Sequence, residues 1–106
     1  MINGKTQSGF EYSIDENKLK SKAFQKLIIK LNRAASDTAE DKAATEIIMV
    51  EDEYEVFVLG EEQQEKLIDY LNGQSETGYA SVQEVQAEVN EIVAAVSEKS
   101  KDVKNS

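Results

Sequence analysis

The sequence contains no cysteine and no histidine, and its five glycines are scattered. Without cysteine there is no disulfide and no thiolate nucleophile, and without both residue types the usual ligands of structural zinc are missing. Histidine is also the most common general base in enzymes. The glycines (Gly4, Gly9, Gly60, Gly73 and Gly78) form no phosphate-binding loop. We therefore expect no enzymatic activity, no metal site and no cofactor.

Long apolar runs are also absent. Residues 1–6 lack the apolar core of a signal peptide, and no window approaches the roughly 20 apolar residues that would span a bilayer. We expect a cytoplasmic protein without membrane contact. Its 106 residues suffice for a single domain over residues 1–97. Residues 98–106 have almost nothing to bury and are predicted to be a flexible tail.

The charge is acidic and unevenly distributed. The formal net charge is −9, from 12 basic and 21 acidic residues. Residues 16–33 hold six bases and one acid, a balance of +5, whereas residues 37–76 hold two bases and 13 acids, a balance of −11. This opposition could dock one segment on the other or pair neighbouring copies in a homo-oligomer, or the two faces could simply be solvated. The sign of the net charge argues against binding to nucleic acid.

Period-two alternation marks the first element. Residues 10–14 alternate apolar and polar side chains, as in a half-buried strand, and Ser8 and Gly9 supply a turn before it. The sequence therefore predicts a β-hairpin over residues 1–14. A lone hairpin is marginal in water, so this one must pack on the helices of its own chain or extend a sheet with a second copy.

The remainder, residues 15–97, has helical periodicity. Asp15 is a suitable N-cap for a helix that runs to about Arg33 with an apolar face. That face comprises Leu19, Ala23, Phe24, Leu27, Ile28 and Leu31. A basic ridge adjoins it and contains Lys18, Lys22, Lys26 and Lys30. Ile29 falls within this ridge, so it is either a contact for a partner or an isolated exposed isoleucine.

A second helix is predicted over residues 39–59. Residues 34–37 break the first helix, and Asp37 can cap the next. Its apolar residues recur at intervals of three and four: Ala44, Ile47, Ile48, Val50, Tyr54, Phe57 and Val58. The competing signal is the high strand propensity of residues 54–58 after the acidic run 51–53, which would split the segment into two elements. We favour one helix.

A sharp corner at Gly60 organises the chain. Glycine tolerates the positive φ that ends a helix, and Glu61 and Glu62 suit the positive end of the next helix dipole. The helix after Gly60 places Leu67, Ile68 and Leu71 in the core and is predicted to end at Asn72–Gly73. The last helix follows a polar connector and is capped by Ser81 with Glu84 three residues later. Its apolar stripe is Val82, Val85, Val89, Ile92, Val93 and Val96.

The predicted fold is thus mainly α: a small domain of three to four amphipathic helices with an N-terminal β-hairpin. Three groups of carboxylates, at residues 15–16, 51–55 and 61–62, lack the spacing of a calcium loop, and we interpret them as solvated. The candidate contacts for a protein partner are Ile29 in the basic ridge and three residues that would line a groove between the helices, near the corner and the end of the following helix: Phe57, Val58 and Tyr70. The alternative for residues 57–59 is an ordinary core role.

Three segments carry a resemblance to a known family. Residues 1–12 read MINGKTQSGFEY, residues 59–67 read LGEEQQEKL, and residues 104–106 read KNS. Together, in this order, they resemble the small tail assembly chaperones encoded by siphophages and prophages of Gram-positive bacteria. The segment from Lys18 to Val58 departs from the pattern that we expect of that family, because it is lysine-rich and then acidic.

The resemblance implies a non-enzymatic protein in the cytoplasm of the bacterial host. Its partners would be the phage tail tube protein and the tape measure protein, and it would be absent from the mature virion. Two other classes stay open. One is an acidic protein that mimics DNA and inhibits a nucleic-acid enzyme, which the net charge favours. The other is a structural tail or head-completion protein that remains in the particle.

Overall fold

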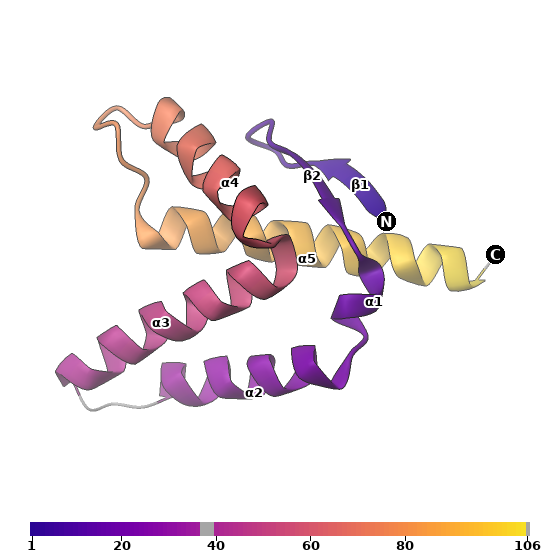
Figure 1. Cartoon of the computed structure of the whole chain (residues 1–106), viewed down its shortest axis with the longest axis horizontal. Coiled ribbons are helices and arrows are strands. Elements are labelled where there is room, and N and C mark those ends of the chain that lie inside the picture. The colour runs from indigo at the N-terminus through magenta and orange to yellow at the C-terminus, as the bar shows by residue number, and fades with distance from the viewer. Residues whose placement is uncertain (37–39, 106) are drawn as a thin grey trace.

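A computed structural model describes the backbone of residues 1–36 and 40–105 and the side chains of residues 1–36 and 46–99. The elements are β1 (Ile2–Lys5), β2 (Glu11–Ile14), α1 (Glu16–Leu19), α2 (Lys22–Ser36), α3 (Glu40–Leu59), α4 (Glu61–Gln74) and α5 (Val82–Asn105). Figure 1 shows the hairpin packed beside the helices. The predicted class is confirmed, because an N-terminal antiparallel hairpin is followed by the single turn α1 and by four substantial helices.

The hairpin forms where the alternation predicts it. The register pairs Ile2 with Ile14, Asn3 with Ser13, Gly4 with Tyr12 and Lys5 with Glu11. Gly9 has a φ of 104°, and its N–H donates to the carbonyl of Thr6 at 3.0 Å, as in a three-residue loop closed by a left-handed residue. The side chains of Phe10, Tyr12 and Ile14 are buried. The hairpin therefore packs on the helices of its own chain.

The first predicted helix is interrupted, so the prediction of one helix over residues 15–33 is wrong. Asp15 caps α1 as expected, but α1 lasts a single turn. The hydroxyl of Ser21 then donates to the carbonyl of Lys18 at 2.6 Å and accepts from the N–H of Phe24 at 3.1 Å. A serine hydroxyl that bonds to the backbone in this way competes with the bonds of a continuous helix. The chain therefore turns and starts α2 afresh.

The favoured single helix is confirmed for α3, which continues unbroken to Leu59. Val50, Tyr54 and Val58 lie four residues apart and are all buried, so the helical period prevails over the strand propensity of this segment. The predicted cap at Asp37 and the predicted apolar contact of Ala44 lie outside the described residues.

The corner at Gly60 is also confirmed. Gly60 has φ 82° and ψ 155°, a conformation that is open essentially to glycine alone. Its N–H donates to the carbonyl of Val56 at 2.8 Å, and its own carbonyl accepts the N–H of Gln64 at 3.0 Å. One residue therefore completes the hydrogen bonds of α3 and starts those of α4. Glu61 and Glu62 occupy the first turn of α4, as predicted.

Both later helices extend beyond their predicted ends. α4 passes through Gly73 and ends at Gln74. Ser81 caps α5 as predicted, because its hydroxyl accepts the N–H of Glu84 at 3.1 Å. α5 then continues to Asn105, although the sequence predicted a helix end near residue 97. Lys99 explains part of this extension, since its Nζ donates to the carbonyl of Asn3 at 2.9 Å and holds the helix beside the hairpin.

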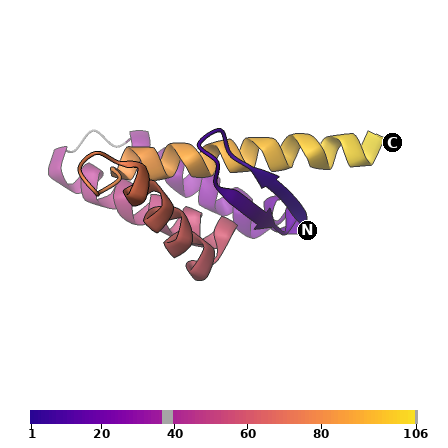
Figure 2. The ribbon, with the colours of Figure 1, turned by 90° about the horizontal axis from the view of Figure 1, so that it is seen from above.

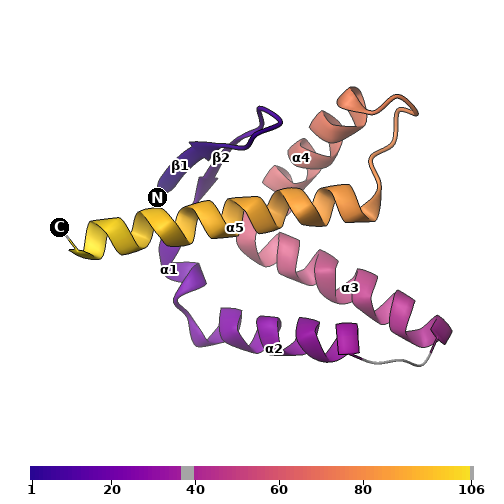
Figure 3. The same ribbon diagram turned by 180° about the vertical axis from the view of Figure 1, so that it is seen from behind.

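The elements form a flat molecule with extents of 47 × 34 × 20 Å. The shortest extent is about two helix diameters, so the fold is two layers thick. α5 runs along one side of the molecule (Figure 2), and Figure 3, seen from behind, shows it in front of the hairpin, α4 and the end of α3. α2 packs chiefly against α3, on the side away from α5. The core cluster joins the hairpin to all four long helices: Phe10, Tyr12, Ile14, Phe24, Tyr54, Val58, Leu59, Leu67, Leu71, Val85, Val89, Ile92 and Val96.

Candidate functional site

A groove opens between α3 and α5. The two helices lie close near the C-terminal end of α3 and diverge toward the N-terminal end of α5 (Figure 3). A hollow of about 230 Å³ lies there, and we call it the α3–α5 groove. Its apolar lining is Ile48, Ile68, Ala80, Val82 and Val85. Its polar lining is Glu51, Asp52, Glu55, Gln64 and Ser81.

Two large apolar side chains of the groove are open to solvent. Ile48 is 48% exposed and Val82 is 46% exposed. The sequence counted Ile48 among the apolar residues at helical spacing and Val82 in the apolar stripe of the last helix, and in the structure both side chains are exposed. They lie where α3 and α5 have diverged, so neither helix covers the other there. The result is an apolar surface that a partner could bury.

The connection between α4 and α5 fixes one wall of the groove. The side-chain Oδ1 of Asn72 accepts the N–H of Ala80 at 2.7 Å, which anchors the loop to the end of α4. Gly78 has a φ of 83° and allows the chain to reverse within the loop. The Ser81 cap then starts α5. Ala80 and Val82 are thus held in place by hydrogen bonds on either side.

The opposite wall carries a small carboxylate network. Nε2 of Gln64 donates to Oδ1 of Asp52 at 2.8 Å and to Oε1 of Glu55 at 3.0 Å. Glu55 is only 5% exposed, whereas Asp52 is exposed. Both carboxylates come from α3, and the amide reaches them from α4. One amide nitrogen therefore joins two acidic groups at the edge of the groove.

Burial makes two of these acids weaker. Desolvation raises the pKa of Glu55, the hydrogen bond from Gln64 opposes that rise, and the negative charges of Asp52 and Glu51 add to it. Desolvation also raises the pKa of Glu51. The groove thus combines apolar side chains with carboxylates whose charge is costly in their present surroundings.

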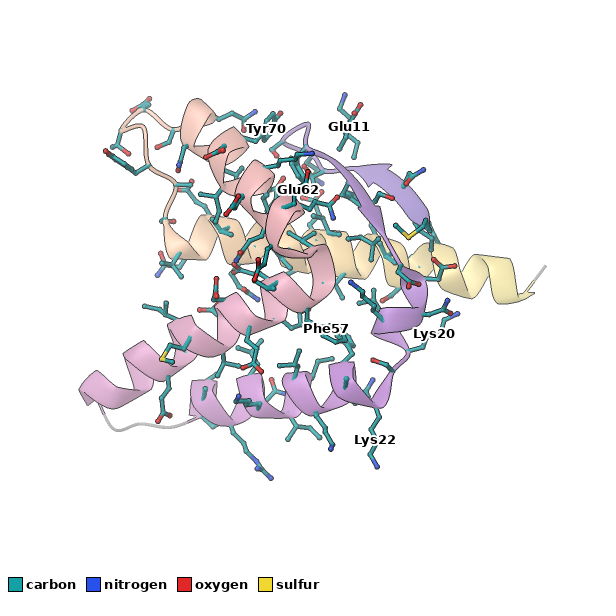
Figure 4. The ribbon with its side chains drawn as sticks, viewed as in Figure 1. Glu11, Lys20, Lys22, Phe57, Glu62 and Tyr70 are labelled. Atoms are coloured by element: carbon teal, nitrogen blue, oxygen red, sulfur yellow. The ribbon has the colours of Figure 1, made fainter. Side chains whose placement is uncertain are left out.

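A basic face lies elsewhere, on the outer side of α2. Lys22, Lys26, Ile29 and Arg33 are exposed and are spaced so that they share one helix face. Figure 4 shows the Lys22 side chain pointing away from the rest of the molecule. Lys30, which the sequence grouped with this ridge, instead forms an ion pair with Glu53 of α3 at 2.9 Å.

The four predicted partner contacts do not form one site. Ile29 is 52% exposed on α2, so it remains available to a partner. Phe57 is half-buried and stacks on Phe24, with ring centroids 6.1 Å apart. Val58 is 2% exposed and belongs to the core, which is the alternative role that its position suggested. Tyr70 is half-buried beside the hairpin loop.

Sequence reasoning expected a groove near residues 57–60 and Tyr70, and it did not predict the α3–α5 groove. Its apolar residues read as ordinary members of helical stripes, and its carboxylates read as a solvated run. Exposure of Ile48 and Val82 depends on the angle between α3 and α5, which no local pattern encodes. Burial of Glu55 depends in the same way on the approach of α4.

A second hollow, of about 470 Å³, lies between α2 and α3. Met49 is 66% exposed there. Lys30 and Glu53 both line this hollow and form an ion pair with each other. The charges of these two lining residues are therefore neutralised within the chain. The acids of the α3–α5 groove have no such partner among the described residues.

Comparisons of the chain with protein-family models, curated proteins and solved structures give no match. Within residues 1–36 and 40–105, no helix has both the length and the apolar character needed to cross a membrane. Among the side chains that the structure describes, those of residues 1–36 and 46–99, no group of three or more acidic residues is placed to hold a metal ion.

Proposed function

We propose that this chain is a non-enzymatic tail assembly chaperone that binds the tail tube protein, the tape measure protein or both during phage tail morphogenesis. The observation that carries this proposal is the α3–α5 groove, where apolar side chains stay open to solvent beside acidic ones. The resemblance of residues 1–12, 59–67 and 104–106 to such chaperones supports the choice of client.

The size of the groove favours a protein segment over a small molecule. Pockets for drug-sized ligands typically measure about 300–1,000 Å³. The α3–α5 groove, at about 230 Å³, is smaller, and its Ile48 and Val82 side chains are about half exposed. It suits one or two side chains that project from a larger partner. An amphipathic helix delivers apolar side chains at intervals of three and four residues, which is the usual way to fill such a groove.

In the proposed mechanism, the α3–α5 groove transiently covers an apolar segment of the client protein. The tape measure protein would expose apolar helical segments until the tail tube surrounds it, and the groove would shield one such segment. The net charge of −9 would keep the complex from aggregating. We place this activity in the cytoplasm of the bacterial host and expect the chain to leave before the virion is complete.

The two alternative functions, a DNA mimic and a structural tail or head-completion protein, can be told apart from the chaperone. A DNA mimic needs carboxylates repeated at phosphate-like spacing over a continuous face. The exposed bases Lys22, Lys26 and Arg33 interrupt the acidic surface and weigh against that alternative. A structural tail or head-completion protein would remain in purified virions, which the chaperone would not.

A pull-down tests the proposal with a matched pair of variants. The tagged chain is expressed in cells that produce the phage, and recovered proteins are identified by mass spectrometry. Ile48→Glu introduces a charge into the groove, whereas Ile29→Glu introduces the same charge on α2 at a residue of similar exposure, 48% against 52%. We expect wild type and Ile29→Glu to recover tail tube or tape measure protein and Ile48→Glu to lose it.

Other results of the pull-down would indicate a different binding surface or a different function. Loss of the client with Ile29→Glu alone would move the contact to the basic face of α2. Recovery of a nuclease or polymerase without tail proteins would favour the DNA mimic. Circular dichroism of both variants shows whether each remains folded, so a loss of binding can be assigned to the surface.

A further inference from the structure

The hairpin has an outer edge along β2. In an antiparallel pair of strands, residue pairs with and without hydrogen bonds between them alternate along the ladder. The N–H of Thr6 donates to the carbonyl of Phe10 at 2.9 Å, and from that bond the register places Glu11 and Ser13 in the pairs without hydrogen bonds. The backbone N–H and C=O groups of Glu11 and Ser13 therefore point away from β1, toward the position of a third strand.

A side-chain amide occupies part of this edge. Oε1 of Gln63 accepts the N–H of Ser13 at 2.9 Å, and Nε2 of Gln63 donates to the carbonyl of Ser13 at 3.1 Å. The same nitrogen donates to the carbonyl of Leu59 at 3.0 Å, which fixes the orientation of the amide. One amide thus makes with Ser13 both of the hydrogen bonds that a residue of a neighbouring strand would make.

The rest of this edge is open. Glu11 is exposed, and its backbone forms no hydrogen bond with another described residue. A hollow of about 520 Å³ lies beside Glu11 and Ser13 and extends to residues 59–63 of the corner. On the other strand, by contrast, the carbonyl of Asn3 accepts a hydrogen bond of 2.9 Å from Lys99 of α5. β2 is therefore the strand that has both outward backbone groups and space beside them.

We infer that Gln63 is an amide plug, which holds the place of a third strand and prevents β2 from pairing with β2 of a second copy. An edge strand with free backbone groups is prone to pair with another chain, and proteins block such edges in several ways. If Gln63 withdraws, Ser13 loses both hydrogen bonds to the amide, and a second β2 can replace them. This inference concerns the hairpin and does not depend on the identity of a client.

The second copy is the partner that this edge fits, because β2 is complementary to itself. Two antiparallel copies related by a twofold axis at Tyr12 place Glu11 of each copy opposite Ser13 of the other. This register uses every outward N–H and C=O group of these two residues. The side chains that meet are a carboxylate and a hydroxyl, so no like charges face each other.

Sedimentation equilibrium of Gln63→Ala tests the inference. We expect this variant to dimerise at least about tenfold more tightly than wild type, which is the scale of one hydrogen bond. Gln63→Met keeps the length of the side chain but lacks the amide, and it should behave like Gln63→Ala. Gln25→Ala is the matched control, because Gln25 is exposed on α2, and it should associate no more tightly than wild type.

Amide hydrogen exchange, measured by NMR, locates the association. In dilute Gln63→Ala, the N–H of Ser13 should exchange faster than in wild type, because its acceptor has been removed. At high concentration of this variant, the N–H groups of Glu11 and Ser13 should both become protected. In wild type, the N–H of Glu11 should exchange rapidly at both concentrations.

A charge at position 13 tests the register of the dimer. Ser13→Lys, added to Gln63→Ala, places an ammonium group opposite Glu11 of the second copy and should tighten the dimer. Ser13→Glu, added to the same variant, places a carboxylate there and should weaken it. Equal effects of these two changes would contradict the pairing of Glu11 with Ser13.

Two further outcomes would overturn the inference. One is a Gln63→Ala protein that is folded by circular dichroism and associates no more tightly than wild type. The other is a dimer in which the N–H groups of Glu11 and Ser13 stay unprotected, because that dimer would use a different surface.

Discussion

The hydroxyl of Tyr70 donates a hydrogen bond of 2.6 Å to the backbone carbonyl of Ser8. This bond joins α4 to the loop of the hairpin. The ring of Tyr70 also lies against Phe10, with centroids 5.7 Å apart. The side chain that the sequence offered as a partner contact therefore has an internal role, and its removal should affect folding before it affects binding.

We expect Tyr70→Phe to lower the free energy of unfolding by about 1 kcal/mol, because it removes the hydroxyl and leaves the Ser8 carbonyl without that donor. Urea unfolding measures this change. Tyr79→Phe is the matched control, since Tyr79 is 79% exposed, and it should leave stability unaltered. Unchanged stability of Tyr70→Phe together with weaker client binding would return Tyr70 to the partner surface.

Two glycines should respond to alanine with opposite signs. Gly60→Ala forces an L side chain into a φ of 82° and should cost about 1–3 kcal/mol. Gly73→Ala lies within α4, meets no atom within 4 Å of the added carbon, and should stabilise by about 0.5–1 kcal/mol. Thermal and urea unfolding of both variants give the comparison. Equal effects at the two positions would contradict the role assigned to the corner.

The apolar stripe of α5 should divide into a core part and a surface part. Ile92 is fully buried, so Ile92→Ala should lower the free energy of unfolding by about 2–5 kcal/mol. Val82, at the start of the same stripe, is 46% exposed, and Val82→Ala should change stability by no more than about 0.5 kcal/mol. A large loss with Val82→Ala would mean that the groove is closed in solution.

Replacement of Glu55 should alter the dependence of stability on pH. Burial raises the folded-state pKa of Glu55 above its ordinary value of 4.5, so the folded chain holds this proton more tightly than the unfolded chain. The resulting stabilisation is present below the unfolded pKa and is lost as the pH rises through the folded pKa. Glu55→Gln should therefore match wild type in acid and exceed its stability at neutral pH.

Urea unfolding across about pH 3 to 8 measures that difference, a range that brackets the titration of carboxyl groups. Glu98→Gln serves as the control for the loss of one negative charge at an exposed position. A difference between Glu55→Gln and wild type that is independent of pH would contradict the assignment.

Local signals explain why much of the fold was predictable. The alternation of residues 10–14, the glycine at position 60 and the Ser81 cap each act over a few residues, and each produced the expected element. The break at Ser21 was missed because a serine inside a periodic stripe bonds to the backbone only in some contexts. The groove was missed because it depends on the divergence of α3 and α5 and on the approach of Gln64 to Glu55.

Position 60 requires glycine because of its left-handed backbone conformation and not because a side chain would lack space. No atom lies within 4 Å of the position that a β-carbon would take at Gly60, so the surroundings leave room for a side chain. The positive φ is what an L residue resists. A D-alanine introduced by chemical synthesis at position 60 would fit the free space and would favour the positive φ. It would also restrict the unfolded chain, so the turn between α3 and α4 would be more rigid than it is with glycine.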